Sequence, residues 1–318
     1  MKNQILLVGA GPMATEYAKV LEAQNLEYSV VGNTKEGAAS FELEMKKEVV
    51  IGGLNKWMEQ NSKTEVNKYK VIVVVNENLL GSVTCDLLNF GFKEILVEKP
   101  GGLNFSDIEK VNQLAKDNKA NVYIGYNRRF FASTLKALEL IKLDGGVTSF
   151  NFEFTEWGHV IKDLVKNEGV LEEWFIQNSS HVIDLAFFIG GMPTEMKSFV
   201  GGGSTWHPKG TVFSGAGITA ENALFTYNAN WESAGRWWTE FLTKENRYIM
   251  KPMEKIFVQK RGSIQVDEFE INDEFDRLFK PGLYKQVEAF IQFEDKLMKI
   301  EEQVKMIPFY SQMCKRKV

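Results

Sequence analysis

A turn of small residues separates the first apolar run of the chain from a helical pattern. Residues 4–8 read QILLV, a short run typical of a strand that is buried on both faces. Gly9, Gly11 and Ala14 follow with the spacing G-x-G-x-x-A, and residues 14–24 have apolar positions at helical spacing. Strand, glycine turn and helix in this order form the context in which the spacing binds a dinucleotide pyrophosphate. This feature predicts a Rossmann-type α/β fold for the N-terminal part.

Each residue of the turn has its own expected role. Gly9 permits a tight turn, Gly11 allows the backbone to approach the pyrophosphate, and Ala14 allows close packing of helix on strand. Pro12 and Met13 lie where the helix begins, and the N-terminus of a helix attracts anions. We therefore expect all five residues to contact the cofactor.

The residue expected to bind the adenine ribose carries no charge. Asn33 lies 22 residues after Gly11 (33 minus 11), at the end of the expected second strand. An acid there would bind the 2′-hydroxyl and repel a 2′-phosphate. Thr34 and Lys35 follow, and a hydroxyl beside a cation suits a phosphate, although Glu36 opposes one. The pattern favours NADP and leaves NAD as the alternative, with Asn33 on the ribose.

Strand-like and helix-like segments alternate through the first 126 residues, which predicts a doubly wound parallel sheet. The expected strands are 4–8, 28–32, 69–76, 94–100 and 120–127, and the expected helices are 14–24, 79–91 and 104–118. In the last helix, Ser106 is the expected N-cap, with Glu109 three residues later. We expect residues 1–126 to form an NAD(P)-binding Rossmann domain.

The pattern changes after residue 126. Phe150, Phe152 and Phe154 alternate with polar residues, which indicates a strand with one buried face. A chain of 318 residues is too long for one ordinary core. We expect residues 127–318 to form an α+β substrate-binding domain with a large, predominantly antiparallel sheet that joins copies into a homodimer or homotetramer. Its expected helix is 131–142, and its expected strands are 148–157, 196–203, 222–231, 236–243 and 247–253.

Composition excludes several classes of protein. A net charge of −4 argues against a nucleic-acid binder, which needs a basic face. Two cysteines outside any C-x-x-C pattern favour a reducing compartment over a disulfide framework. No apolar run approaches the roughly 20 residues that span a membrane, so we expect a cytoplasmic protein. His159 and His207 stand in no ligand spacing, and we expect no catalytic metal.

Four motifs in order resemble the Gfo/Idh/MocA oxidoreductase family. They are the glycine turn, VEKPGG at 97–102, YIGYNRRF at 123–130, and the histidine in NSSHVIDLAFFIGG at 178–191. The resemblance covers essentially the whole chain. The family includes glucose–fructose oxidoreductase, inositol dehydrogenases and nucleotide-sugar dehydrogenases. It implies hydride transfer between a nicotinamide and a carbon of a sugar or sugar nucleotide. The layout is also similar to that of biliverdin reductase.

The resemblance assigns chemistry to the strand end ILVEKPGG. Lys99 lies at the carboxyl end of a parallel strand, where such sheets bind ligands, and the following proline favours an extended backbone. We expect Lys99 to donate to a sugar hydroxyl and to stabilise the developing alkoxide. Lys99 is also expected to contact the cofactor, with Glu98 on the nicotinamide ribose and Asn127 near the nicotinamide. Asn76 ends the preceding strand and Asn78 matches the family's next loop, so both are expected to contact the cofactor.

The histidine of the last motif is the expected general base. Ser179 or Ser180 could cap a helix whose apolar face includes Ile183. His181 would then lie in the first turn, near the positive end of the helix dipole, which disfavours the imidazolium. The alternative is a core histidine. The resemblance favours catalysis, with Lys99 and His181 as the catalytic pair.

The chain departs from the family in two places. Many members have an aspartate four residues before the histidine, where this chain has Gln177. Glutamine can orient a ligand but cannot exchange a proton, so Asn178 and Asp184 are candidates to take its place. Asp184 lies three residues after His181, on the same side of a helix. In addition, Gly81 stands where the family loop often has a histidine.

Aromatic and basic residues of the second half are candidates for substrate binding. Trp157 could stack on a sugar ring, as could Trp174, Trp237 and Trp238, although core packing or an oligomer interface is the alternative for each. Arg236 could bind a phosphate or carboxylate, and the role of Arg129 is ambiguous. The expected substrate contacts are Lys99, Trp157, Gln177, Asn178, His181 and Arg236.

The sequence thus favours an NAD(P)-dependent dehydrogenase or reductase acting on CH–OH groups of a sugar or sugar nucleotide. Two alternatives stay open. One is a non-catalytic NAD(P)-binding sensor or regulator on the same fold, which Gln177 favours and the intact Lys99 and His181 oppose. The other is a reductase of a non-sugar carbonyl, as in the biliverdin reductase layout.

Overall fold

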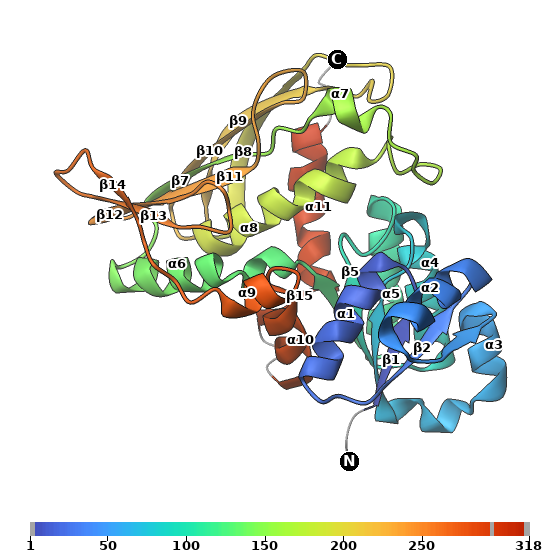
Figure 1. Cartoon of the computed structure of the whole chain (residues 1–318). Coiled ribbons are helices and arrows are strands. Elements are labelled where there is room, and N and C mark those ends of the chain that lie inside the picture. The colour runs from blue at the N-terminus through green and yellow to red at the C-terminus, as the bar shows by residue number, and fades with distance from the viewer. Residues whose placement is uncertain (1–3, 293–295, 315–318) are drawn as a thin grey trace. The chain divides into compact units, whose positions relative to one another are not determined.

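The computed structural model describes residues 4–292 and 296–314, and the chain divides into two compact units. The first unit comprises Met1–Tyr126 and Leu278–Lys305, and the second comprises Asn127–Arg277 and Met306–Val318. Figure 1 labels their helices and strands. Residues 278–305 were expected in the second domain, and this prediction is corrected, because they belong to the first unit.

The first unit is built on a seven-stranded sheet with the order β15-β6-β5-β4-β1-β2-β3. All of its pairings are parallel except that of β15 with β6. The inner strands are apolar because both of their faces are covered, and Ile5, Leu6 and Leu7 are fully buried. The strands are β1 (Gln4–Val8), β2 (Tyr28–Gly32), β3 (Val49–Ile51), β4 (Tyr69–Val73), β5 (Glu94–Glu98), β6 (Asn121–Gly125) and β15 (Met298–Lys299).

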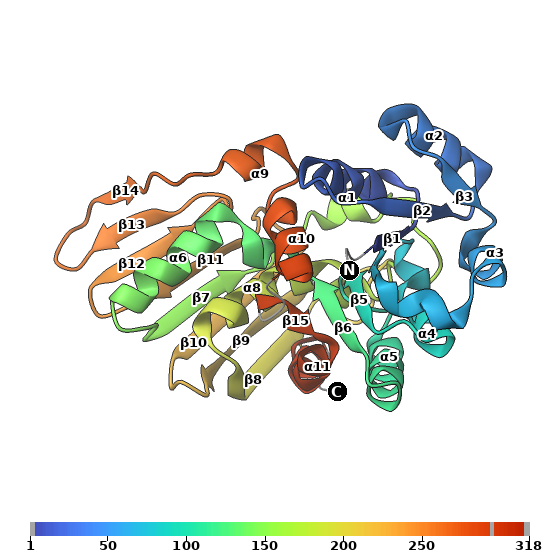
Figure 2. The same cartoon turned by 90° about the horizontal axis from the view of Figure 1, so that it is seen from below.

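Helices cover both faces of this sheet. Helices α1 and α2 lie on one face and α4 and α5 on the other (Figure 2), with α10 beside α1. The helices are α1 (Pro12–Ala23), α2 (Lys35–Met45), α3 (Gly53–Gln60), α4 (Leu80–Phe90), α5 (Phe105–Asp117) and α10 (Leu283–Gln292), with short helices η1 (Lys63–Lys68) and η2 (Glu77–Leu79). Strand β1 lies between β4 and β2, so the chain order reverses there. Ligands bind parallel sheets at the carboxyl ends of strands beside such a reversal.

The N-cap of α5 differs from the prediction. The side chain of Asn104, not Ser106, caps the helix, because its Oδ1 accepts from the backbone N–H of Asp107 at 3.0 Å. Asp107 Oδ2 in turn accepts from the N–H of Leu103 at 3.1 Å. Both asparagine and aspartate satisfy the free N–H groups of a first turn, and the reciprocal pair begins two residues earlier than expected.

The second unit is built on an eight-stranded sheet with the order β14-β13-β12-β11-β7-β10-β9-β8. Its pairings are antiparallel except that of β10 with β7. The strands are β7 (Ser149–Glu153), β8 (Pro193–Gly201), β9 (Val212–Thr219), β10 (Leu224–Asn230), β11 (Trp238–Leu242), β12 (Asn246–Met250), β13 (Phe257–Lys260) and β14 (Val266–Glu268).

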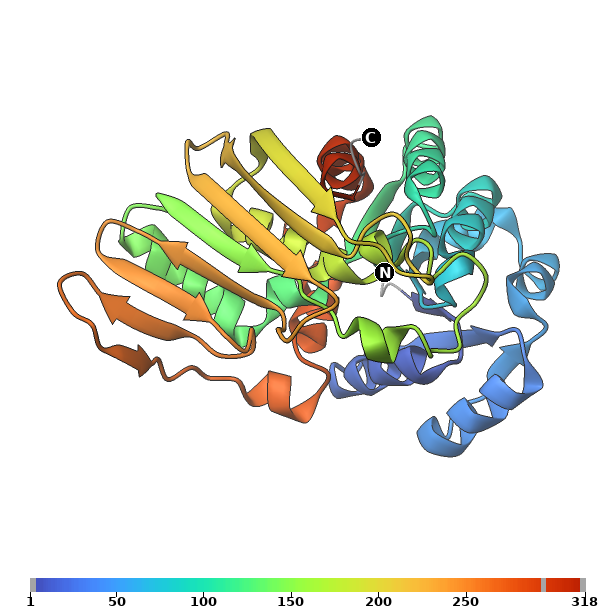
Figure 3. The same cartoon turned by 90° about the horizontal axis from the view of Figure 1, so that it is seen from above.

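Helices α6 and α8 lie on one face of this sheet, and Figure 3 looks onto the opposite face. The core between α8 and the sheet is aromatic: Phe150 and Phe152 are buried and contact Phe187 edge to face. The helices are η3 (Asn127–Phe130), α6 (Ala132–Leu143), α7 (Gly158–Ile161), η4 (Phe175–Ser179), α8 (Ser180–Gly190) and α9 (Glu274–Leu278), and α11 (Ile300–Cys314) begins in the first unit and ends in the second.

The predicted fold class is confirmed: a parallel, doubly wound sheet forms one unit, and a large, mostly antiparallel sheet forms the other. Within the described ranges, no helix is long and apolar enough to cross a membrane.

Candidate functional site

The two glycines of the first turn have different surroundings. Gly9 has φ +124°, and a Cβ atom there would lie 2.2 Å from the carbonyl oxygen of Val74. Only glycine fits that position. Gly11 is the N-cap of α1, and a Cβ atom there would meet nothing within 4 Å. The second glycine therefore borders open space, which is where the pyrophosphate of a dinucleotide lies in this motif.

A pocket of about 360 Å³ opens beside this turn. Its walls come from the ends of β1, β2 and β4 and from the starts of α3 and α4. Backbone at the glycine turn and apolar side chains around it suit a phosphate and an adenine ring, respectively. The lining residues are Val8, Gly9, Ala10, Gly11, Val31, Asn33, Thr34, Gly37, Gly52, Gly53, Leu54, Asn55, Val74, Val75, Asn76, Leu79, Val83 and Asp86. These residues fit a bound dinucleotide.

The residue that follows β2 at the pocket, Asn33, carries no charge. Asn33 faces Gly53: a Cβ atom on that glycine would lie 3.0 Å from Asn33 Oδ1. Thr34 caps α2, because its Oγ1 accepts from the N–H of Gly37 at 3.1 Å. Lys35 is the first residue of that helix. Among the described residues that line the pocket, the one acid is Asp86 on α4.

The expected cofactor residues outside the turn are placed unevenly. Asn76 lines the pocket and precedes η2, whereas Asn78 lies within η2 and does not line it. Pro12 and Met13 form the start of α1, beside the pocket but outside its lining. Asn127 is buried and begins η3 in the second unit.

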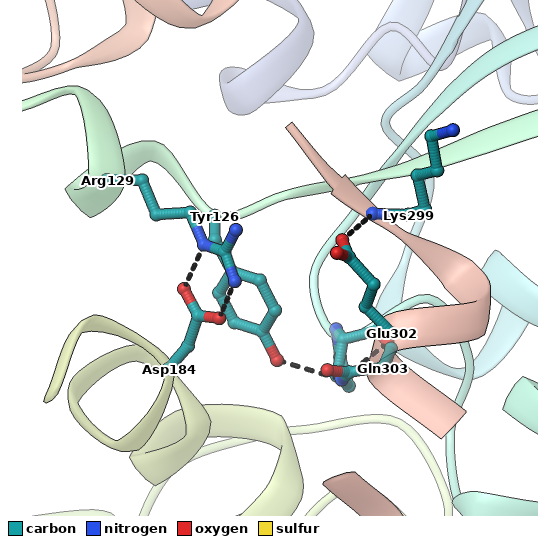
Figure 4. A network of polar contacts seen from close by, with 7 residues as sticks. Tyr126, Arg129, Asp184, Lys299, Glu302 and Gln303 are labelled. Atoms are coloured by element: carbon teal, nitrogen blue, oxygen red, sulfur yellow. Dashed lines mark hydrogen bonds and ion pairs between the residues drawn. The ribbon is translucent and has the colours of Figure 1, made fainter. Parts of the chain in front are cut away.

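The turn that carries Lys99 is anchored by the C-terminal part of the first unit. Strand β5 ends at Glu98, and the Lys99–Pro100 peptide is cis. Gln303 on α11 donates from Nε2 to the carbonyl oxygen of Pro100 at 3.2 Å and to the Tyr126 hydroxyl at 2.9 Å. Figure 4 shows the bond to Tyr126. Since Gln303 is fully buried, it holds this turn in one conformation.

Glu98 belongs to a second network of the first unit. Tyr17 on α1 donates its hydroxyl to Glu98 Oε1 at 2.7 Å, and Gln286 on α10 donates to the Tyr17 oxygen at 2.7 Å. Burial raises the pKa of the Glu98 carboxyl, while the Tyr17 hydrogen bond and the charge of Lys99 oppose the rise. One Glu98 oxygen is thus engaged by protein in addition to the expected contact with the ribose, which stays a prediction.

His181 lies on α8, but not at a free helix N-terminus. A π-helical segment, η4, runs directly into α8, and Ser179 between them has helical dihedrals (φ −66°, ψ −21°) and makes no capping bond. The predicted serine cap is therefore wrong, and with it the argument from the helix dipole. The preceding turn already supplies carbonyl partners where a free N-terminus would have none. π-Helical turns within helices often occur at functional sites.

A buried carboxylate, Glu156, holds the π-helical segment. Its side chain is 1% exposed. Asn178 Nδ2 donates to both of its oxygens at 3.0 Å, and Ser179 Oγ donates to Oε1 at 3.1 Å. Arg236 Nη1 lies 3.9 Å from its Oε2. Glu156 was not expected from the sequence, because it lies three residues past the end of β7 and no spacing connects it to the histidine motif.

Asp184 is paired elsewhere. Arg129 donates from Nε at 2.8 Å and from Nη2 at 2.6 Å to the two Asp184 oxygens, a bidentate pair shown in Figure 4. Both partners are largely buried. Asp184 is therefore committed to Arg129, and Asn178 is committed to Glu156. Gln177, which is buried, carries no charge to replace the family's aspartate.

Of the four tryptophans expected near a substrate, Trp237 lies beside His181, and Trp157 packs with Trp237 on the side chain of Arg236. The ring centroids of Trp237 and His181 are 6.0 Å apart. The Arg236 guanidinium lies 4.8 Å from the Trp157 ring centroid and 4.9 Å from that of Trp237. The other two do not join them. Trp174 is buried, and Trp238 donates to Glu153 across strands β11 and β7.

Lys99 belongs to the first unit, and His181, Trp157, Gln177, Asn178 and Arg236 belong to the second. Among the described residues, no three His, Cys, Asp or Glu side chains lie close enough to hold a metal ion.

Comparison with known proteins identifies the first unit. The model of the oxidoreductase family with an NAD-binding Rossmann fold, Gfo/Idh/MocA, matches residues 3–126. These residues carry the NAD-binding domain of the Gfo/Idh/MocA family. The resemblance seen in the sequence is thereby confirmed for this part of the chain. A search of curated proteins finds no match.

Solved structures of several oxidoreductases share the fold of nearly the whole chain. A Desulfitobacterium hafniense protein described as an NADPH-dependent oxidoreductase aligns with a TM-score of 0.78 at 14% identity, over 98% of this chain and 94% of its own. UDP-N-acetylglucosamine 3-dehydrogenase of Acidithiobacillus ferrooxidans aligns at 0.73 and 11% identity, over 99% and 97%. Levoglucosan dehydrogenase in complex with NADH and levoglucosan aligns at 0.75 and 13% identity, over 98% and 95%.

Proposed function

We propose that the protein is an NAD(P)-dependent oxidoreductase that acts on a hydroxyl or carbonyl carbon of a sugar or sugar nucleotide. The observation that carries this proposal is the combination, within one unit, of open space at Gly11 and an anchored Lys99. The first fits a dinucleotide and the second a reacting oxygen. The sugar dehydrogenases among the solved structures support the substrate class.

The expected roles follow from charge. A nicotinamide cofactor held by the glycine turn would supply hydride transfer to or from the substrate carbon. In the oxidative direction, a ring nitrogen of His181 accepts the hydroxyl proton, and Lys99 stabilises the negative charge that develops on the oxygen. Because Gln303 and the proline hold the turn, the lysine needs little rearrangement as charge develops. Preorganisation of this kind is the main source of electrostatic catalysis.

We further propose NADP as the preferred cofactor. Asn33 is neutral, Thr34 is the N-cap of α2, and Lys35 is the first residue of that helix. Glu36 in the first turn of α2 opposes a phosphate, but the position expected to bind the ribose, Asn33, carries no acid. The relatives include an NADPH-dependent oxidoreductase and a complex with NADH, so the choice rests on these side chains. Dissociation constants for NADP and NAD, measured side by side, test it; tighter binding of NAD would contradict it.

The partner proposed for the second sheet is another copy of this chain, in a homodimer or homotetramer. Figure 3 shows a face on which α6 and α8 do not lie, and Phe199 on β8 is 73% exposed. An open sheet face with exposed aromatic side chains is typical of an interface. Sedimentation of the whole chain should give the mass of a dimer or tetramer, and a monomer would contradict the proposal.

The test of the enzymatic proposal is turnover with a panel of sugars and sugar nucleotides, followed by nicotinamide absorbance. Lys99→Met keeps most of the side-chain stem and should lower kcat by about 10²–10³, a larger effect than on cofactor binding. His181→Ala should cost about 10²–10⁴, the usual value of a general base. The double variant should lose less than the product of the two, because both act on one proton and one oxygen.

Unchanged kcat in Lys99→Met would remove Lys99 from the mechanism. Cofactor binding without turnover on any substrate would favour the alternative of a sensor or regulator.

A further inference from the structure

The indole ring of Trp237 contacts the ring of His181 and the guanidinium groups of two arginines. Its ring centroid lies 6.0 Å from that of His181, and the Cζ atoms of Arg128 and Arg236 each lie 4.9 Å from it. Arginines within about 6 Å of an aromatic centroid are held by cation–π attraction. Trp237 is 8% exposed, so these groups, and not a sugar ring, occupy its surroundings. The neighbourhood of the expected base is therefore cationic.

Arg236 is positioned but remains accessible. Its guanidinium is sandwiched between Trp157 and Trp237, and its side chain is 52% exposed. Trp157 is itself oriented, since its Nε1 donates to the carbonyl oxygen of Gly235 at 3.1 Å. An arginine held between two rings has lost much of its rotamer freedom before a ligand arrives, which reduces the entropic cost of binding.

The carboxylate of Glu156 forms only a long ion pair with Arg236. Glu156 lies 3.9 Å from Arg236 Nη1, near the limit of an ion pair, whereas its hydrogen bonds to Asn178 and Ser179 are about 3 Å long. Arg128 packs on the same indole, and its chain neighbour Arg129 is paired with Asp184. A guanidinium offers five N–H donors in a plane that matches a carboxylate or phosphate. One distant carboxylate leaves most of that capacity for a ligand.

We propose, on the basis of the proposed function, that the substrate carries an anionic group on the same sugar unit as the reacting hydroxyl and that Arg236 binds this group. The shared chemistry is a carboxylate, as in a uronic acid, or the first phosphate of a sugar phosphate or nucleotide sugar. Arg128 adds positive charge on the same indole. Neutral sugars lack the group and bind poorly.

The distances limit where the anion can lie. Since His181 and Arg236 are 6.0 and 4.9 Å from the same indole centroid, they are at most about 11 Å apart. If the ligand lies in line between the two groups, with hydrogen bonds of about 3 Å at each end, the reacting oxygen and the anion are at most about 5 Å apart. That span corresponds to a single sugar ring and its direct substituent, and not to a second sugar or a distant nucleotide group.

The experiment measures binding, so that it does not depend on turnover. Calorimetric titration of the protein with NADP present would compare D-glucuronate, D-glucose 1-phosphate and UDP-glucose with neutral D-glucose. At least one anionic probe should bind about tenfold or more tightly than glucose, and the carboxylate and phosphate probes distinguish the two sources of charge. Arg236→Gln should weaken that probe about tenfold to a hundredfold and leave glucose unchanged.

Two further variants separate charge recognition from structure. Arg236→Lys should recover part of the affinity, because lysine keeps the charge but loses the planar fork. Lys209→Gln is the matched control: its side chain is 50% exposed and pairs with Glu173, and its loss should change no affinity. Equal binding of glucose and all anionic probes, no binding of any anionic probe, or unchanged affinities in Arg236→Gln would each overturn the proposal. Failure of the enzymatic proposal would appear separately, as unchanged turnover in Lys99→Met.

Discussion

The glycine turn of the first unit and the π-helical segment of the second act in opposite ways. In the turn, the lack of a side chain is what matters: Gly9 leaves room for the carbonyl oxygen of Val74, and Gly11 borders open space. The π-helical segment works through side chains that gather, because Asn178 and Ser179 both donate to one buried glutamate. A function carried by backbone is contained in a few consecutive residues. A function carried by a polar network depends on segments far apart in the chain.

The largest effect is expected at the turn. Gly9→Ala forces a Cβ atom to within 2.2 Å of a carbonyl oxygen at φ +124°. Overpacking and backbone strain together should lower the free energy of unfolding by about 2–6 kcal/mol. Gly11→Val should abolish cofactor binding and change stability by less than about 1 kcal/mol, because its position is extended and open.

Chemical denaturation and cofactor titration on both variants check this difference. Equal losses of stability in Gly9→Ala and Gly11→Val would contradict these roles of the two glycines, and so would cofactor binding by Gly11→Val.

A smaller effect is expected in the π-helical segment. Glu156→Gln keeps the size of the side chain but removes the charge that accepts from Asn178 and Ser179. Hydrogen bonds to charged groups contribute about 1.5–3 kcal/mol, so stability should fall by an amount in that range. Cofactor affinity should be unchanged, since Glu156 belongs to the other unit. Lys209→Gln, an exposed change in the same unit, is the control. A stability equal to that of the parent protein would show that the glutamate is not holding the segment.

The smallest effect concerns pH. Because the pKa of Glu98 is raised from its usual 4.5, the folded state binds the proton more tightly than the unfolded state. Its contribution to stability is full below pH 4.5 and is lost as the pH rises through the raised value. Glu98→Gln resembles the protonated acid and should avoid this loss. Its stability relative to the parent should therefore increase as pH rises above 4.5.

Thermal unfolding between pH 4 and 8, without added cofactor, tests this expectation. Glu109→Gln, an exposed change on α5, is the control. A stability difference that does not vary with pH would contradict the assignment.

Local patterns predicted most of the first unit. Alternating apolar runs and helical spacings located β1, α1, β5 and their neighbours, and the glycine spacing located the turn. These patterns did not locate α2, whose apolar periodicity is weak. Helices α3 and α10 were also not predicted although both are strongly amphipathic, and a local pattern does not show that α10 packs on α1 in the first unit. In the second unit, a histidine after two serines resembled a helix start. The chain was already helical, because a glutamate more than twenty residues earlier accepts the hydroxyl that would have formed the cap.

The anchor of the lysine turn comes late in the chain. Gln303 follows Lys99 by 204 residues (303 minus 99), and α10 and β15 also lie beyond residue 280. During synthesis, β1, α1 and the glycine turn emerge first. The turn at Lys99 must then wait, without its partner from α11, until the whole second sheet has been made. We infer that a nascent or C-terminally shortened chain could form the nucleotide turn without a correctly held lysine.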